Sequence, residues 1–169
     1  MYMGHVGIGL GAKRFARAAP LWLLLVAALL PDLVDAVGGL TPWAHWCQTH
    51  SHKLTGIAGG AILMGAAAWV IGRTFISALV AALLVVSHLL ADFVTSRIAP
   101  WPNGPVIGLA LYNHHILDFF VEGIVILSGW WLYRDQLPRE RQFHWAFFAM
   151  LVTLLGFQFL LDGVVGVSG

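Results

Sequence analysis

Five apolar stretches of about twenty residues each dominate this sequence. They cover residues 19–38, 55–72, 75–96, 114–133 and 143–166. A helix needs about 20 consecutive apolar residues to cross the hydrocarbon core of a bilayer. Because backbone polar groups in a bilayer must be satisfied within the protein, we predict an all-α fold, a polytopic bundle of about five transmembrane helices.

The charge content agrees with this prediction. Only 10% of the 169 residues are charged and 59% are hydrophobic, whereas a soluble domain carries about 25% charged residues. We therefore expect residues 1–169 to form a single integral-membrane domain. The net charge of +1 gives no indication of nucleic acid as a partner. The single cysteine, Cys47, excludes an internal disulfide and a cysteine-based zinc site.

The ends of the apolar stretches differ in charge. The segment MYMGHVGIGLGA at the start is too short to span a bilayer, and we predict a short re-entrant or interfacial helix there. The linker after it and every second connection carry Lys13, Arg14, Arg17, Arg73, Arg134, Arg139 and Arg141, and the other connections carry only Lys53 and Arg97. The positive-inside rule then predicts a cytoplasmic N-terminus and extracytoplasmic loops at 39–53 and 97–113.

Ionisable side chains occur inside the apolar stretches, where each is costly unless it is paired or ligated. The acids placed within or at the ends of these stretches are Asp32, Asp35, Asp92, Asp118, Glu122 and Asp162. His88 and Asp92 are four residues apart and share a helical face. From their depth along the helices, we predict that these groups meet in one layer toward the extracytoplasmic side, where His88 and Asp92 face Asp32. The residues expected in this layer are Asp32, Asp35, His45, His50, His52, His88, Asp92, His114, His115, Asp118 and Glu122.

Histidine and carboxylate ligands without a thiolate suit zinc or another divalent first-row metal. A pair at i, i+4 can deliver two ligands to one ion. Pro31 removes a backbone donor within the first span and can kink it, as expected beside a cavity. A hydrogen bond between two helices is the structural alternative for His88 and Asp92.

Four short motifs occur in order along the chain: GH at 4–5, LPDLVD at 30–35, THSHKL at 49–54 and SHLLAD at 87–92. In this order they resemble the membrane-bound metal-dependent hydrolase family, whose members lie in bacterial inner membranes and include a LexA-regulated branch. The resemblance covers residues 1–133, and WPNGPVIGLALYN followed by a glutamate is similar to a sub-branch. It implies an inner-membrane location and a metal-dependent hydrolase.

The resemblance also implies site residues. His5, Asp32, His88 and Asp92 match metal-ligand positions of the family, and Asp35 matches the second acid of its acid cluster. The histidine run leaves two alternatives, His50 and His52, of which we prefer His52 because Leu54 follows it as in the family motif. Trp46 stands where part of the family has an arginine.

His5 tests the predicted geometry. It lies eight residues before Lys13, so a short helix would lift it only about 12 Å from the inner surface. That level is shallower than the one expected for His88 and Asp92.

Together these features predict a hydrolase that holds one or two divalent ions, zinc in the first place. A metal-activated water would attack a phosphoester or related bond of a lipid or lipid-linked substrate, with Asp35 or Glu122 as general base. Alternatively, Asp35 and His50 would be a further ligand or would support the ligands. One alternative is a transporter that conducts protons or metal ions, which needs a polar track to the other side. Another is a non-catalytic membrane protein with a structural metal held by four protein ligands.

Overall fold

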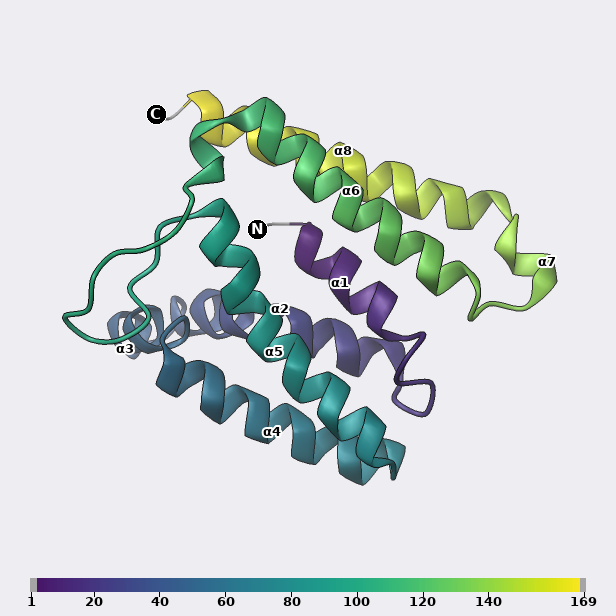
Figure 1. Ribbon diagram of the computed structural model, residues 1–169, viewed down its shortest axis with the longest axis horizontal. Coiled ribbons are helices and arrows are strands. Elements are labelled where there is room, and N and C mark those ends of the chain that lie inside the picture. The colour runs from purple at the N-terminus through teal and green to yellow at the C-terminus, as the bar shows by residue number, and fades with distance from the viewer. Residues whose placement is uncertain (1–2, 168–169) are drawn as a thin grey trace.

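The computed structural model describes residues 3–167 and is an all-α bundle (Figure 1). Its helices are α1 (Gly4–Ala12), α2 (Leu21–Gly38), α3 (Ala44–His50), α4 (Leu54–Gly72), α5 (Phe75–Thr95), the 3₁₀ turn η1 (Leu111–Asn113), α6 (His115–Arg134), α7 (Arg139–Gln142) and α8 (Trp145–Val167). Among the described residues, α2, α4, α5, α6 and α8 are long and apolar enough to cross a membrane. The predicted fold class is confirmed, and each predicted span agrees with its helix to within two residues at either end.

Local sequence signals explain several helix ends. Pro20 precedes α2 in an extended conformation and cannot extend the helix backwards. Arg73 ends α4 in the left-handed region, at a φ of 50°. The Thr74 side chain then accepts a hydrogen bond from the backbone N–H of Ser77, which caps α5. Pro31 lies within α2 but does not end it, since the helix continues to Gly38.

The predicted short N-terminal helix is present as α1, which is packed inside the bundle between α2, α5 and α6. Its nine residues rise only about 14 Å, which is half a bilayer core. Glycine allows α1 to approach α6 closely. A Cβ on Gly7 would lie 2.8 Å from the Cα of Ile126, and a Cβ on Gly129 would overlap the carbonyl oxygen of Gly7.

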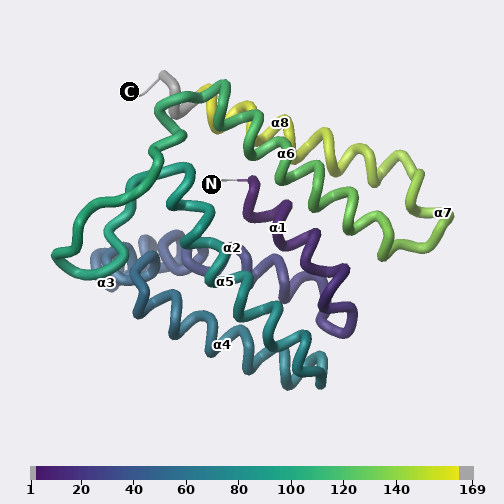
Figure 2. Tube along the Cα trace, in the orientation of Figure 1, coloured from purple at the N-terminus to yellow at the C-terminus, as the bar shows by residue number. Residues whose placement is uncertain are grey.

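The connections that carry most of the basic residues lie at one end of the bundle (Figure 2). The end of α1, the α4–α5 turn and the connection from α6 to α8 all lie there. We call this the basic end, defined by Lys13, Arg14, Arg17, Arg73, Arg134, Arg139 and Arg141. Helix α3 and the loop 97–113 lie at the opposite end. The structure thus places most of the basic residues at one end of the bundle, as the sequence predicted. The side of the membrane that each end faces stays a prediction.

The packing of α1 on α6 predicts an asymmetric response to two glycine substitutions. Gly129→Ala should destabilise the protein by about 1–3 kcal/mol, because the new methyl group forces α1 away from α6. Gly156→Ala in α8 is the matched control, since nothing lies within 4 Å of a Cβ at that position. Thermal melting in detergent measures both. Equal melting temperatures for the two variants would contradict the close α1–α6 contact.

Candidate metal centre

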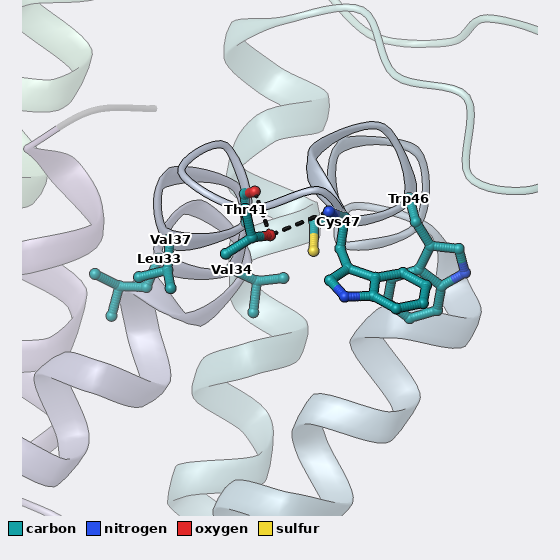
Figure 3. Close-up of a pocket in the computed structure, with 8 residues that line it drawn as sticks. Leu33, Val34, Val37, Thr41, Trp46 and Cys47 are labelled. Carbon is teal, nitrogen blue, oxygen red and sulfur yellow. Dashed lines mark hydrogen bonds between the residues drawn. The ribbon is translucent and has the colours of Figure 1, made fainter.

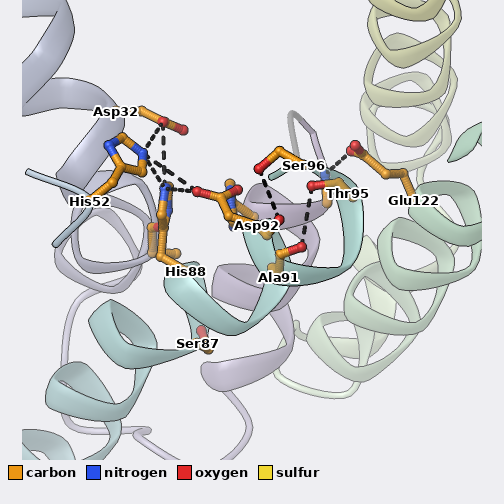
Figure 4. A network of polar contacts seen from close by, with 12 residues as sticks. Asp32, His52, Ser87, His88, Ala91, Asp92, Thr95, Ser96 and Glu122 are labelled. Atoms are coloured by element: carbon orange, nitrogen blue, oxygen red, sulfur yellow. Dashed lines mark hydrogen bonds and ion pairs between the residues drawn. The ribbon is translucent and has the colours of Figure 1, made fainter. Parts of the chain in front are cut away.

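Four side chains from three separate segments meet between α2 and α5 (Figure 4). They are Asp32 of α2, His52 of the turn before α4, and His88 and Asp92 of α5. The Nε2 atom of His52 lies 3.2 Å from Nε2 of His88, 3.3 Å from Oδ1 of Asp32 and 3.5 Å from Oδ2 of Asp92. Nε2 of His88 lies 3.4 Å from the same oxygen of Asp32 and 3.3 Å from the same oxygen of Asp92.

These five distances match the edge length of a tetrahedral zinc site and form two triangles, one with Asp32 and one with Asp92, that share the His52–His88 edge. With zinc bonds of about 2.0–2.1 Å, neighbouring ligand atoms of a tetrahedral site lie about 3.3–3.4 Å apart. The five distances among the donor atoms of the four side chains run from 3.2 to 3.5 Å. The set contains two imidazole nitrogens and two carboxylate oxygens, which suit a divalent first-row metal. The cluster can therefore hold one such ion.

The hydrogen bonds of His88 leave the correct ring nitrogen for a metal. Its Nδ1 lies 2.9 Å from the backbone carbonyl oxygen of Ala28 in α2. A carbonyl can only accept, so Nδ1 carries the proton and a neutral ring keeps the lone pair of Nε2 for the cluster. The same bond fixes the ring plane, because His88 is fully buried.

His52 is oriented by a carboxylate in the same way. Its Nδ1 lies 3.3 Å from Oδ2 of Asp35 and 2.9 Å from the hydroxyl of Ser51. The Ser51 hydroxyl donates to the other oxygen of Asp35. Carboxylate–histidine–metal arrangements of this kind fix the tautomer and the ring orientation of a ligand. Asp35 thus lies behind His52, and the structure does not place it as the predicted general base.

His5 reaches the cluster, against the shallow position expected from its distance to Lys13. Its Nε2 lies 3.3 Å from Oδ1 of Asp92, the second oxygen of that carboxylate, and its ring stacks on His88 at 3.8 Å. Helix α1 packs on α2, α5 and α6, and this packing brings His5 to the level of His88 and Asp92. The shallower level expected for His5 is therefore wrong.

Two overlapping groups of side chains could hold an ion: His5, His88 and Asp92, and Asp32, His52 and His88. Both need Nε2 of His88, since Nδ1 is engaged with Ala28. One nitrogen lone pair serves one ion, so the two groups cannot each hold an ion through His88 at the same time. We place the ion in the group with Asp32 and His52, where Oδ2 of Asp92 also lies 3.3 Å from His88 and 3.5 Å from His52. His5 then donates to Asp92 and holds that carboxylate in place.

The cluster is buried on three sides and accessible on one. The side chain of His88 is 0% exposed and that of Asp92 is 10% exposed. The Asp32 side chain is 47% exposed, and that of His52 is 26% exposed. A small molecule can therefore reach the donor atoms from the side of Asp32.

His50, the alternative in the histidine run, is not part of the cluster. Its Nδ1 lies 2.8 Å from the backbone carbonyl oxygen of Trp46, and its ring stacks on the Trp46 indole. His50 belongs to the last turn of α3, whereas His52 follows the helix and turns inward. The structure thus selects His52, and the prediction of His50 as a ligand is corrected.

Glu122, the second predicted general base, has a structural position. Its buried carboxylate accepts a hydrogen bond of 2.8 Å from the backbone N–H of Gly4, at the start of α1. Gln158 of α8 accepts one of 3.1 Å from the N–H of Met3. These side chains satisfy donors that a helix start leaves unpaired, and the carboxylate favours the positive end of the helix dipole. In Figure 4, Glu122 lies beyond Asp92, away from the accessible side at Asp32.

An apolar pocket of about 610 Å³ beside α3 is separate from the cluster (Figure 3). Val34 and Val37 of α2 line it together with Trp46 and Cys47 of α3. Val34 is two residues from Asp32 and so lies on another face of α2.

Sequence reasoning missed three supporting groups. The Ser51 hydroxyl was readable from its place between two histidines, and Gln158 was readable as a polar residue in an apolar span. The carbonyl of Ala28 carried no signal, because any residue offers one. Comparison of the chain with family models, with curated proteins and with solved structures finds no match. The resemblance to the hydrolase family therefore stays a prediction based on motifs.

We predict that removing the orienting carboxylate weakens metal binding. Asp35→Ala should lower zinc affinity roughly 10- to 100-fold, since His52 loses the acceptor that fixes its ring. His50→Ala is the control and should keep the wild-type affinity. Competition with a chromophoric chelator measures both. Weaker binding in His50→Ala than in Asp35→Ala would contradict the assignment of His52.

A second prediction distinguishes a stabilising role of Glu122 from a role as general base. Glu122→Leu leaves the buried N–H of Gly4 without its acceptor and should cost about 1–3 kcal/mol of stability. Glu122→Gln keeps an acceptor and should melt close to the wild type. Thermal melting with parallel zinc analysis makes the comparison. A stable Glu122→Gln variant that binds zinc but has lost all turnover would instead support the general base.

Proposed function

We propose that this protein is a membrane-embedded, zinc-dependent hydrolase that acts on a phosphoester or similar bond of a lipid or lipid-linked substrate. The observation that carries the proposal is a cluster of nitrogen and oxygen donors at metal-ligand spacing with one half-exposed member, Asp32. Zinc bound by this set would activate a water as a nucleophile near neutral pH. The motif resemblance supports the same class of activity.

The residues around the cluster have separable tasks in this proposal. His52, His88, Asp32 and Asp92 supply the donor atoms. Asp35 orients His52, and His5 orients Asp92. The apolar helices on the buried sides exclude bulk water, which strengthens electrostatic interactions with a substrate phosphate. Asp32 borders the accessible side, where its carboxylate can take up a proton from the attacking water.

A lipid substrate follows from the surroundings of the site. The donor residues of α2 and α5 belong to helices that are long and apolar enough to span a membrane. A substrate with hydrocarbon chains can approach these helices from the bilayer, with its polar group at the level of the cluster. The transporter alternative is less well supported, because the buried residues of α5 in the two turns before His88, which are Ala81, Leu84 and Val85, are all apolar.

A structural zinc is the second candidate, and the number of protein ligands favours it. Structural zinc sites have four protein ligands, whereas catalytic sites usually have three and an exchangeable position. Here four side chains offer donor atoms, and each imidazole nitrogen lies within 3.2–3.5 Å of the other nitrogen and of one oxygen from each carboxylate. For hydrolysis, a water molecule must bind the ion. This requires either that Asp32 leaves the ion or that the ion accepts a fifth ligand on the accessible side.

The test begins with zinc analysis of the purified protein, for which we expect about one ion per chain. The protein is then assayed on phospholipids and lipid phosphates in mixed micelles, before and after chelation and reloading. The hydrolase proposal predicts turnover that is lost on chelation, restored by zinc and absent in Asp92→Ala. One zinc per chain whose removal lowers the melting temperature, with no zinc-dependent turnover on any substrate, would establish the structural role instead.

A further inference from the structure

A groove of about 580 Å³ runs along the half of the bundle toward the basic end, between α5 and α6. Both helices pack on α1 and make little contact with each other, so α1 forms the floor of the groove. In Figure 1, α5 and α6 diverge on either side of α1. The groove is distinct from the metal cluster, whose four side chains do not line it.

The lining of the groove is almost wholly apolar. Its walls include Leu83 and Ser87 of α5 and Ser128 and Leu132 of α6, and its floor includes Gly11 and Phe15. Ser87 donates its hydroxyl to the carbonyl oxygen of Leu84 within α5, so it offers no free donor to the groove. A water molecule finds few hydrogen-bond partners in such a space. A hydrocarbon chain there covers the apolar lining and makes van der Waals contacts with it.

The end of the groove meets an excess of positive charge. Phe15 and Leu132 line that end, and Arg14 and Arg134 lie one and two residues from them in the sequence. These two arginines share one carboxylate, that of Asp135, at 3.1 and 3.6 Å. Exposed Arg17 adds a further positive charge to the linker after α1. Basic residues at a membrane surface attract anionic lipids, and basic pockets between spans bind their headgroups.

We propose that this groove is a binding site for an anionic phospholipid, with one acyl chain against α1 between α5 and α6 and the phosphate beside Arg14 and Arg17. The apolar groove fits the acyl chain of such a lipid, and the arginines at its end attract the phosphate of the same molecule. The lipid supports α1, which carries His5, from the side that α6 leaves uncovered. This inference is independent of hydrolysis, because the groove and the metal cluster share no side chain.

Native mass spectrometry of the detergent-purified protein tests the chain-binding part. Phosphatidylglycerol and phosphatidylcholine with identical chains are added to delipidated protein. The wild type should bind one phosphatidylglycerol. Ser128→Phe places a ring in the groove and should weaken this binding at least tenfold, whereas Leu127→Phe, on an adjacent exposed position outside the lining, should not. Leu83→Phe, on the opposite wall, replaces Ser128→Phe if that variant does not fold.

The headgroup part is tested with charge variants. The double variant Arg14→Gln/Arg17→Gln should bind phosphatidylglycerol roughly tenfold more weakly, close to the phosphatidylcholine level. Arg139→Gln/Arg141→Gln is the control, because it removes two charges from α7 at the same end of the bundle. Equal effects of the two double variants would show a non-specific surface attraction and overturn the headgroup assignment.

Two results would overturn the proposal as a whole. One is equal binding of both lipids in the wild type together with unchanged binding in the groove variants. The other is a protein dimer that Ser128→Phe dissociates, which would assign the groove to a second copy of the chain. Neither result bears on zinc binding or turnover, so the proposed hydrolase can fail or hold independently.

Discussion

The arrangement of the bundle depends on how its charges are neutralised in an apolar environment. Asp32 and Asp92 come from helices that meet lipid over most of their length, and a carboxylate in such a place is costly unless it finds a partner. Here both face the same two imidazoles, at 3.3–3.5 Å. A divalent cation in that position balances two carboxylates and satisfies two ring nitrogens at once. The contact of α2 with α5 and the inward course of the turn at His52 bring these carboxylates and imidazoles together.

The second dependence is on α1, a helix too short to span a bilayer. Its buried start needs acceptors for its N–H groups, and Glu122 and Gln158 supply them from α6 and α8. Its glycines let it lie against α6, and its course brings His5 onto His88 and Asp92. Helices far from the cluster therefore act on it through α1. The same half-length leaves the groove between α5 and α6.

The sequence predicted the spans closely because every helix that crosses a bilayer needs an apolar stretch of about the same length. It also predicted that His88, Asp92 and Asp32 share a layer, since helical rise converts residue number into depth. It could not choose between His50 and His52, because that choice depends on where α3 ends. It misjudged the level of His5, because the number of residues between His5 and Lys13 does not show how α1 packs on α2, α5 and α6. The general-base roles given to Asp35 and Glu122 stay predictions, since the structure shows these carboxylates bonded to the His52 and Ser51 side chains and to the start of α1.

The account rests on one claim, that four side chains from α2, α5 and the turn between α3 and α4 bind a single divalent ion. X-ray absorption spectroscopy of the zinc-loaded protein tests this most directly. We predict one zinc per chain with four nitrogen and oxygen neighbours at about 2.0–2.2 Å, two of them imidazole nitrogens with their outer-ring scattering. A shell made only of water or other solvent ligands, a sulfur neighbour, or a spectrum unchanged in the double variant His52→Ala/His88→Ala would contradict it.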